Sequence, residues 1–163
     1  MRKILFFQWN AFMQKGIERA FTYLGMEYDT FYYIFKDWDK DDDFKEKLKK
    51  KLQSGKEEYE YVFSVNFSPL ISEVCNDLQV KYVSWVYDCP FHIRNKEPMK
   101  YSCNTIFFFD RIEAENYRNK GVNAYHLPLA GDTAVSAYAR FASACQCVGA
   151  LLYGKQERRY GTR

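Results

Sequence analysis

Short apolar runs alternate with stretches of helical periodicity along most of this chain, with a repeat of roughly 25 residues. The apolar runs lie at 4–7, 28–35, 61–65, 80–86, 105–109 and 122–127. The run at 4–7 is apolar throughout, as is typical of a strand that helices cover on both faces. Strands that alternate with helices in this way form parallel sheets. The sequence therefore predicts an α/β fold, a Rossmann-like three-layer sandwich with a mostly parallel sheet of about six strands.

Three polar residues mark predicted helix starts. Asn10, Ser68 and Asp110 each precede a stretch of helical periodicity, where a side-chain oxygen can accept hydrogen bonds from free backbone N–H groups. Pro69 suits the first turn of the second of these helices. Another helix is expected on the outside of the fold, because its apolar stripe, Phe44, Leu48 and Leu52, is narrow. By analogy with doubly wound sheets, the predicted strand order is 3-2-1-4-5-6 with right-handed crossovers.

The charge distribution argues against a nucleic-acid-binding face. The net charge is +3, but residues 1–130 hold 19 basic and 19 acidic residues. The basic run 45–51 contains Glu46 and follows three aspartates, which is typical of a solvated helix face. No stretch approaches the roughly 18 apolar residues of a membrane span. We therefore expect no nucleic-acid partner, no membrane span and a cytoplasmic location.

Several catalytic and metal-binding classes lack their motifs here. The five cysteines are an odd number without a CxxC pair, so the sequence predicts neither a disulfide framework nor a metal site. There is no GxGxxG, no GxxxxGK[ST] and no GxSxG. An ordinary dinucleotide site, a P-loop and an elbow-type hydrolase are therefore not expected.

Candidate binding residues follow the predicted strands. In doubly wound sheets ligands bind outside the carboxyl ends of the strands, at the point where the strand order reverses. The predicted order puts this point between strands 4–7 and 80–86. Aromatic rings there can stack on sugars, while amides and carboxylates take the hydroxyl groups. The candidates for substrate binding are Gln8, Trp9, Asn10, Asn66, Phe67, Ser68, Tyr87, Cys89, Pro90, Asp110 and Arg111, with Asp88 as a catalytic base or acceptor-binding carboxylate.

Most of these residues also have a structural interpretation. The three predicted caps are more readily explained as caps than as ligand groups. Trp9 and Trp85 are expected in the core, since Trp is highly buried on average. Asp88 could equally stabilise a turn. His126 is expected to be a hydrogen-bonded structural histidine, whereas His92 lies freer in a long loop.

An ordered set of segments resembles a known family. It resembles the amino-terminal domain of bacterial CgeB-like, spore-maturation-type glycosyltransferases over nearly all of residues 1–130. Residues 147–153 are similar, more loosely, to the strand and glycine turn that open the second Rossmann-like domain of this family. The segments that carry the resemblance are 4–12 (ILFFQWNAF), 63–69 (FSVNFSP), 82–90 (YVSWVYDCP), 107–111 (FFFDR) and 125–130 (YHLPLA).

The resemblance implies the amino-terminal half of a GT-B glycosyltransferase. Residues 1–130 would be the acceptor-side domain, and 131–163 a connector and the start of a truncated second domain. In GT-B enzymes the nucleotide-sugar donor is held mainly by the second domain. We therefore expect a sugar or glycan acceptor as partner, no cofactor on this fragment and no activity without the missing carboxyl-terminal domain.

Two alternatives remain open from the sequence. The chain could be a non-catalytic binding or interaction module on the same sheet, since no motif in it demands catalysis. Apolar surface meant for the second domain could also drive self-association.

Overall fold

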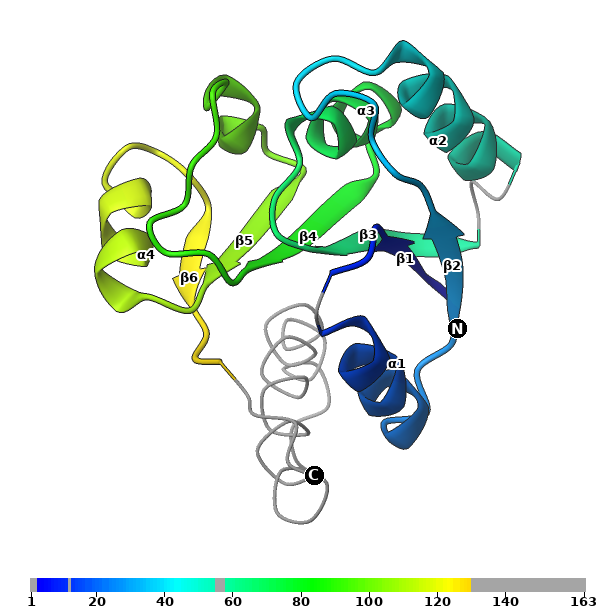
Figure 1. The fold of residues 1–163 in the computed structure, drawn as a ribbon, viewed down its shortest axis with the longest axis horizontal. Helices are drawn as coiled ribbons and strands as arrows, with labels where there is room; N and C mark the ends of the chain where they lie inside the picture. The colour runs from blue at the N-terminus through cyan, green and yellow to red at the C-terminus, as the bar shows by residue number, and fades with distance from the viewer. Residues whose placement is uncertain (1–2, 12, 55–57, 130–163) are drawn as a thin grey trace, which may run out of the picture.

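The sheet is the centre of the fold. The computed structural model describes residues 3–11, 13–54 and 58–129, so the predicted connector and second-domain segment at 131–163 lie outside the described residues. A single sheet of six strands, parallel at every pairing, is flanked by helices on both faces (Figure 1). The predicted Rossmann-like α/β sandwich is therefore confirmed.

Each predicted strand is present in the structure, although β4 is one residue shorter than predicted and the two edge strands, β2 and β6, are each three residues shorter. The strands are β1 (Lys3–Gln8), β2 (Tyr28–Tyr32), β3 (Tyr59–Val65), β4 (Lys81–Val86), β5 (Asn104–Phe108) and β6 (Ala124–His126). The helices are α1 (Gln14–Tyr23), α2 (Asp42–Ser54), α3 (Pro69–Leu78), the 3₁₀ turn η1 (Glu97–Lys100) and α4 (Arg111–Arg118). β2 and β6 lie at the two edges of the sheet, where pairing on one side supports fewer residues.

The predicted strand order is wrong. The observed order is β2-β1-β3-β4-β5-β6, so the order reverses between β1 and β3, not between β1 and β4. β3 is buried along most of its length, with Val62 and Phe63 on opposite faces, and such a strand needs neighbours on both sides. β2 carries the partly exposed polar pair Asp29 and Thr30 and suits an edge. The connection from β1 to β2 runs across the sheet in the opposite direction to the connections that follow. With right-handed crossovers, α1 therefore lies alone on one face among the described helices.

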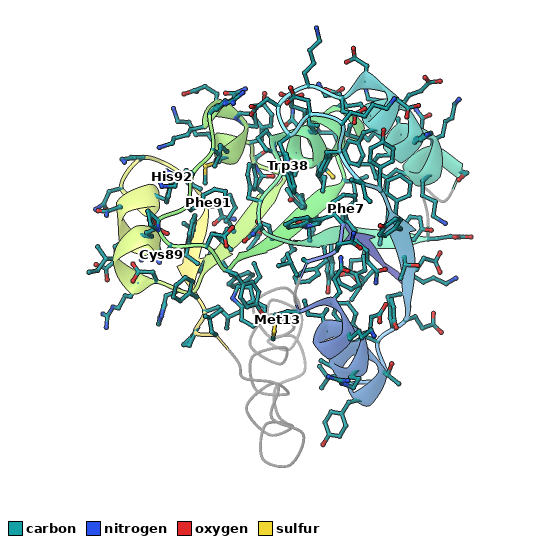
Figure 2. The ribbon with its side chains drawn as sticks, in the orientation of Figure 1. Phe7, Met13, Trp38, Cys89, Phe91 and His92 are labelled. Carbon is teal, nitrogen blue, oxygen red and sulfur yellow. The ribbon has the colours of Figure 1, made fainter. Side chains whose placement is uncertain are left out.

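The two faces of the sheet have separate cores. Phe7 of β1 packs against Phe44 of α2, and Phe7 lies on the same face as Trp38 (Figure 2). Its neighbour Phe6 points to the other face and contacts Phe21 of α1. Because successive side chains of a strand alternate between faces, β1 contributes to both cores.

Helix α2 lies outside the sheet as predicted. Its apolar stripe of Phe44, Leu48 and Leu52 is buried, and its lysines form ion pairs on the outer face. Lys49 pairs with Asp77 of α3 at 2.8 Å. The basic run 45–51 is therefore a solvated helix face.

Two of the three predicted helix caps are confirmed. Ser68 Oγ accepts a hydrogen bond from Ile71 N at 3.5 Å, and Asp110 Oδ1 accepts one from Glu113 N at 2.8 Å.

Asn10 is not a cap, so that prediction is wrong. α1 begins only at Gln14, after Met13, which makes no capping side-chain bond. Asn10 instead adopts a left-handed conformation with φ of 70°, and its Oδ1 accepts a hydrogen bond from the Tyr32 hydroxyl at 3.2 Å. Asn tolerates this conformation better than most residues, and here it turns the chain away from β1 before the helix starts.

Across the described ranges, no helix is both long and apolar enough to span a bilayer.

Candidate functional site

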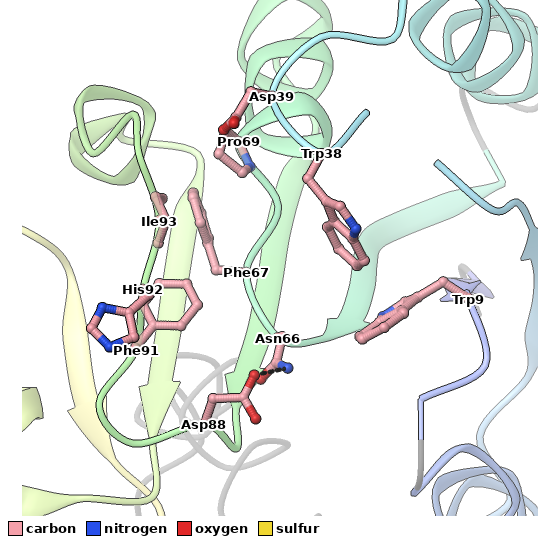
Figure 3. Close-up of a pocket in the computed structure, with 10 residues that line it drawn as sticks. All are labelled: Trp9, Trp38, Asp39, Asn66, Phe67, Pro69, Asp88, Phe91, His92 and Ile93. Atoms are coloured by element: carbon pink, nitrogen blue, oxygen red, sulfur yellow. Dashed lines mark hydrogen bonds between the residues drawn. The ribbon is translucent and has the colours of Figure 1, made fainter. Parts of the chain in front are cut away.

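A pocket of about 220 Å³ opens at the carboxyl ends of β1, β3 and β4. It lies beside the observed reversal of strand order, where parallel sheets bind ligands. Figure 3 shows two tryptophans on one side, a second loop on the other, and a hydrogen-bonded amide and carboxylate between them. The lining residues are Trp9, Trp38, Asp39, Asn66, Phe67, Pro69, Asp88, Phe91, His92 and Ile93.

The structure brings four of the twelve predicted site residues together in this lining, namely Trp9, Asn66, Phe67 and Asp88. The other eight lie outside it: Gln8, Asn10, Ser68, Tyr87, Cys89, Pro90, Asp110 and Arg111. Whether any of the twelve contacts a ligand stays a prediction.

Several of the eight have other interactions. Gln8 Nε2 donates to Glu18 of α1 at 2.6 Å, and Arg111 pairs with Glu115 at 3.2 Å within α4. Ser68 and Asp110 are occupied as helix caps. These side chains stabilise the elements around the pocket.

Asn66 joins the end of β3 to the chain that leaves β4. Its Oδ1 accepts a hydrogen bond from Tyr87 N, and its Nδ2 donates one to Asp88 Oδ2, each at 2.8 Å. Its backbone N donates to Trp85 O at 2.8 Å, and its φ of 59° is left-handed. The amide therefore fixes one oxygen of the Asp88 carboxylate, Oδ2, at the margin of the pocket.

A buried chain of hydroxyl groups supports Asn66 from below. Ser64 Oγ donates to Asn66 O at 2.6 Å and so must accept from the Tyr82 hydroxyl, also at 2.6 Å. Tyr82 in turn accepts from Ser68 N at 3.0 Å. Burial raises the pKa of the Tyr82 phenol, which keeps it protonated as the donor in this chain. Each of these two hydroxyl groups both donates and accepts a hydrogen bond, so the end of β3 is held rigidly.

The first aromatic wall consists of Trp9 and Trp38. Trp9 Nε1 donates to Val65 O at 3.1 Å, and the two indoles meet edge to face with centroids 4.7 Å apart. Trp9 is partly buried, so it belongs to the core margin and to the pocket at once. Trp85 is 3% exposed and donates to Leu127 O, which confirms its predicted place in the core.

The loop that carries Trp38 is anchored by Asp41. This buried carboxylate accepts hydrogen bonds from Lys36 N at 2.9 Å and Phe44 N at 3.0 Å. Burial opposes the ionisation of Asp41, but these N–H groups and the Tyr33 hydroxyl outweigh it and lower the pKa of Asp41. The ring of Trp38, 45% exposed, also packs on Phe35 at 4.7 Å.

The opposite wall comes from the loop after β4. Phe91 N donates to Glu113 Oε1 of α4 at 3.0 Å, which holds this loop against the helix. Arg94 of the same loop pairs with Asp39 at 3.1 Å and so links the two walls. Desolvation by the surrounding protein and the nearby carboxylates of Glu113 and Asp110 raise the pKa of the exposed Cys89 thiol, which disfavours its thiolate as a nucleophile.

The two histidines differ from each other in place. His92 lines the pocket. His126 is exposed at the end of β6, an edge strand, and its role as a hydrogen-bonded structural histidine stays a prediction. Among the residues that the structure describes, no group of three or more His, Cys, Asp or Glu side chains could hold a metal ion.

Sequence reasoning missed six of the lining residues as binding candidates: Trp38, Asp39, Pro69, Phe91, His92 and Ile93. The sequence held one signal for them: the loops after β2 and β4 both leave the carboxyl edge of the sheet, where ligands bind. The place of Trp38 depends on how the backbone of the acidic stretch 37–43 folds around Asp41, which composition does not show.

The fold and the pocket define the class of protein: a Rossmann-like α/β protein with an aromatic pocket at the reversal of its strand order. No family model matches the chain, and no curated protein matches it. One similar solved structure is a crystal structure of the LacI family transcriptional regulator CCPA from Weissella paramesenteroides with bound glucose. The two are 11% identical with a TM-score of 0.43, over 91% of this chain and 55% of the regulator, so the chain spans little more than half of that protein's length. This likeness identifies neither a family nor a function for the chain.

Proposed function

We propose that the pocket binds a sugar and that the described domain is the acceptor-side half of a CgeB-like glycosyltransferase of the GT-B type. The observation that carries the proposal is the combination of tryptophan rings with the Asn66–Asp88 pair in one pocket at the carboxyl edge of the sheet. Rings cover the apolar face of a sugar, and an amide beside a carboxylate takes its hydroxyl groups. The volume of about 220 Å³ suits one ring of a sugar rather than a long chain.

The role proposed for Asp88 follows from its surroundings. The carboxylate is exposed, one of its oxygens is held by Asn66, and it lies in the lining of the pocket. A carboxylate fixed in this way can accept a hydrogen bond from an acceptor hydroxyl and take its proton as that oxygen attacks the sugar donor. The donor, a nucleotide sugar, would be held by the second domain that the resemblance implies.

Sugar binding is tested by NMR on the ¹⁵N-labelled 163-residue chain. Trp9 and Trp38 line the pocket, whereas Trp85 is buried in the core of the opposite face, so its indole signal is an internal reference. We expect sugars to shift the indole signals of Trp9 and Trp38 but not that of Trp85. Trp38→Ala is expected to weaken binding about fivefold to tenfold by loss of ring contact. Tyr23→Ala, on α1, removes an exposed ring elsewhere and is expected to leave binding unchanged.

The enzymatic half of the proposal has its own test. It predicts that the gene continues past Arg163 with a second α/β half, that the longer protein transfers sugar and that the 163-residue chain alone does not. In the longer protein Asp88→Asn is expected to lower kcat about 10²-fold or more while its stability hardly changes. Efficient transfer by the short chain would contradict the proposal.

A non-catalytic sugar-binding module is the second candidate. It is favoured by the fact that Asp88 is the single carboxylate at the Asn66 end of the pocket, with no second acid or base hydrogen-bonded to it among the described residues. Sugar binding by the 163-residue chain, together with no sugar transfer by the longer protein, would select this candidate.

A further inference from the structure

The charges around the pocket are one-sided. Two carboxylates, Asp39 and Asp88, and the imidazole of His92 line it, whereas no Lys or Arg of the described residues does. Asp39 is paired with Arg94 at 3.1 Å, so its charge is largely compensated. Asp88 accepts a hydrogen bond from the neutral amide of Asn66, and among the described residues no ion pair involves it. The pocket therefore holds one carboxylate without a cationic partner.

The aromatic side chains, like the unpaired carboxylate, favour a positively charged ligand. A cation over the face of a tryptophan ring is attracted by the electrons of the ring, and this attraction grows where water is excluded. Trp9 and Trp38 line the pocket that Asp88 lines. An anionic group, such as a phosphate, would meet an unpaired carboxylate and no Lys or Arg in the lining.

We propose that the pocket selects a sugar that carries a positively charged amino group, with the ammonium held by Asp88 and the tryptophan rings. The inference rests on the proposed sugar binding and narrows it to amino sugars. It also gives Asp88 a task in recognition, which Asn66 serves by fixing the carboxylate.

The test compares three probes at pH 6.5 by the indole NMR titration. Glucosamine carries the ammonium, N-acetylglucosamine has the same ring with the charge removed, and glucose 6-phosphate carries an anion. We expect glucosamine to bind about fivefold more tightly than N-acetylglucosamine, as for a solvent-accessible ion pair of about 1 kcal/mol. We expect the weakest binding from glucose 6-phosphate.

Two variants assign the preference to its cause. Asp88→Asn keeps the shape of the side chain and is expected to bring the ratio of glucosamine to N-acetylglucosamine affinity close to one. Glu115→Gln removes the same charge from the exposed face of α4, outside the pocket, and is expected to keep the ratio. The midpoint of thermal unfolding of each variant verifies that the fold is intact.

The outcomes separate this inference from the proposed function. Equal binding of glucosamine and N-acetylglucosamine would overturn the amine preference and leave sugar binding in place. A preference that survives in Asp88→Asn, or tightest binding by glucose 6-phosphate, would also overturn it. If none of the three probes moves the Trp9 and Trp38 signals, both proposals fail.

Discussion

Asn66 makes four hydrogen bonds from a left-handed backbone, more than any other residue at the pocket. Its side chain holds Tyr87 N and Asp88, and its backbone is fixed by Trp85 O and Ser64 Oγ. A residue without a side-chain amide loses the first two bonds, and one that carries a Cβ, such as alanine, also strains the backbone at a φ of 59°, which asparagine and glycine tolerate better.

Asn66 therefore allows its two roles to be separated. Asn66→Gly and Asn66→Ala both remove the side-chain bonds, but only alanine meets the left-handed strain. We expect Asn66→Ala to have a free energy of unfolding about 1 kcal/mol below that of Asn66→Gly, measured by urea unfolding. Both variants should bind sugar more weakly than the wild type. Equal stability of the two variants would show that the backbone relaxes out of the left-handed region.

At this scale the sequence predicted part of the site. Asn66 and Asp88 could be placed together because each follows a buried strand, and the carboxyl ends of parallel strands meet at one edge. Trp38 could not be placed, since its position depends on how Asp41 folds the intervening loop. Asn10 was misassigned because an asparagine before a helix can serve either as a cap or as a left-handed turn residue.

At the scale of elements, the loop between β2 and α2 depends on one buried carboxylate. The pKa of Asp41 is lowered in the folded state, so the folded protein binds its proton less readily than the unfolded chain does. The stability from Asp41 is then fully present above the ordinary aspartate pKa of 3.8 and is lost as the pH falls through the lowered folded value. The pKa values of Asp29 and Asp43 are also lowered, so the stability that they contribute is likewise lost as the pH falls.

Asp41→Asn tests this dependence. At pH 7 we expect the variant to lose about 1–3 kcal/mol of unfolding free energy, since hydrogen bonds from two backbone N–H groups to a buried carboxylate are weakened. The difference from the wild type should shrink as the pH falls from about 3.8 through the lowered folded pKa, below which the wild-type carboxyl is protonated as well. Urea unfolding at the two pH values measures it. As control, Asp77→Asn in the exposed pair with Lys49 should change stability by no more than about 0.5 kcal/mol. A constant difference at all pH values would contradict the role of the charge.

Strand positions were predictable from the apolar runs, whereas the order of the strands was not. The order was taken from the commoner doubly wound pattern, although the residues held a signal against it. β3 is apolar on both faces, while β2 carries Asp29 and Thr30 on its accessible faces. An edge strand tolerates such residues because one of its sides has no neighbour, and this comparison would have put β2 at the edge.

At the scale of the whole molecule, the two cores share one sheet and should unfold together. Phe21 of α1 contacts Phe6, and Phe44 of α2 contacts Phe7, the next residue of the same strand. We expect Phe21→Ala and Phe44→Ala each to lower the free energy of unfolding by about 3–5 kcal/mol. In each variant, far-UV circular dichroism and tryptophan fluorescence should give coincident urea transitions. Transitions that separate would show that the faces unfold independently.

The Arg94–Asp39 bridge joins two segments that are far apart in the sequence, one following β2 and the other following β4. The first segment is held by hydrogen bonds to Asp41 and the second by a hydrogen bond to Glu113. Neither residue takes part in the Asn66–Asp88 hydrogen bond between the two walls of the pocket. The sides of the cavity can thus change residue by residue during evolution while the Asn66–Asp88 pair and the sheet stay as they are. Substitutions confined to these two segments could therefore change the ligand preference of the pocket without altering the residues that stabilise the fold.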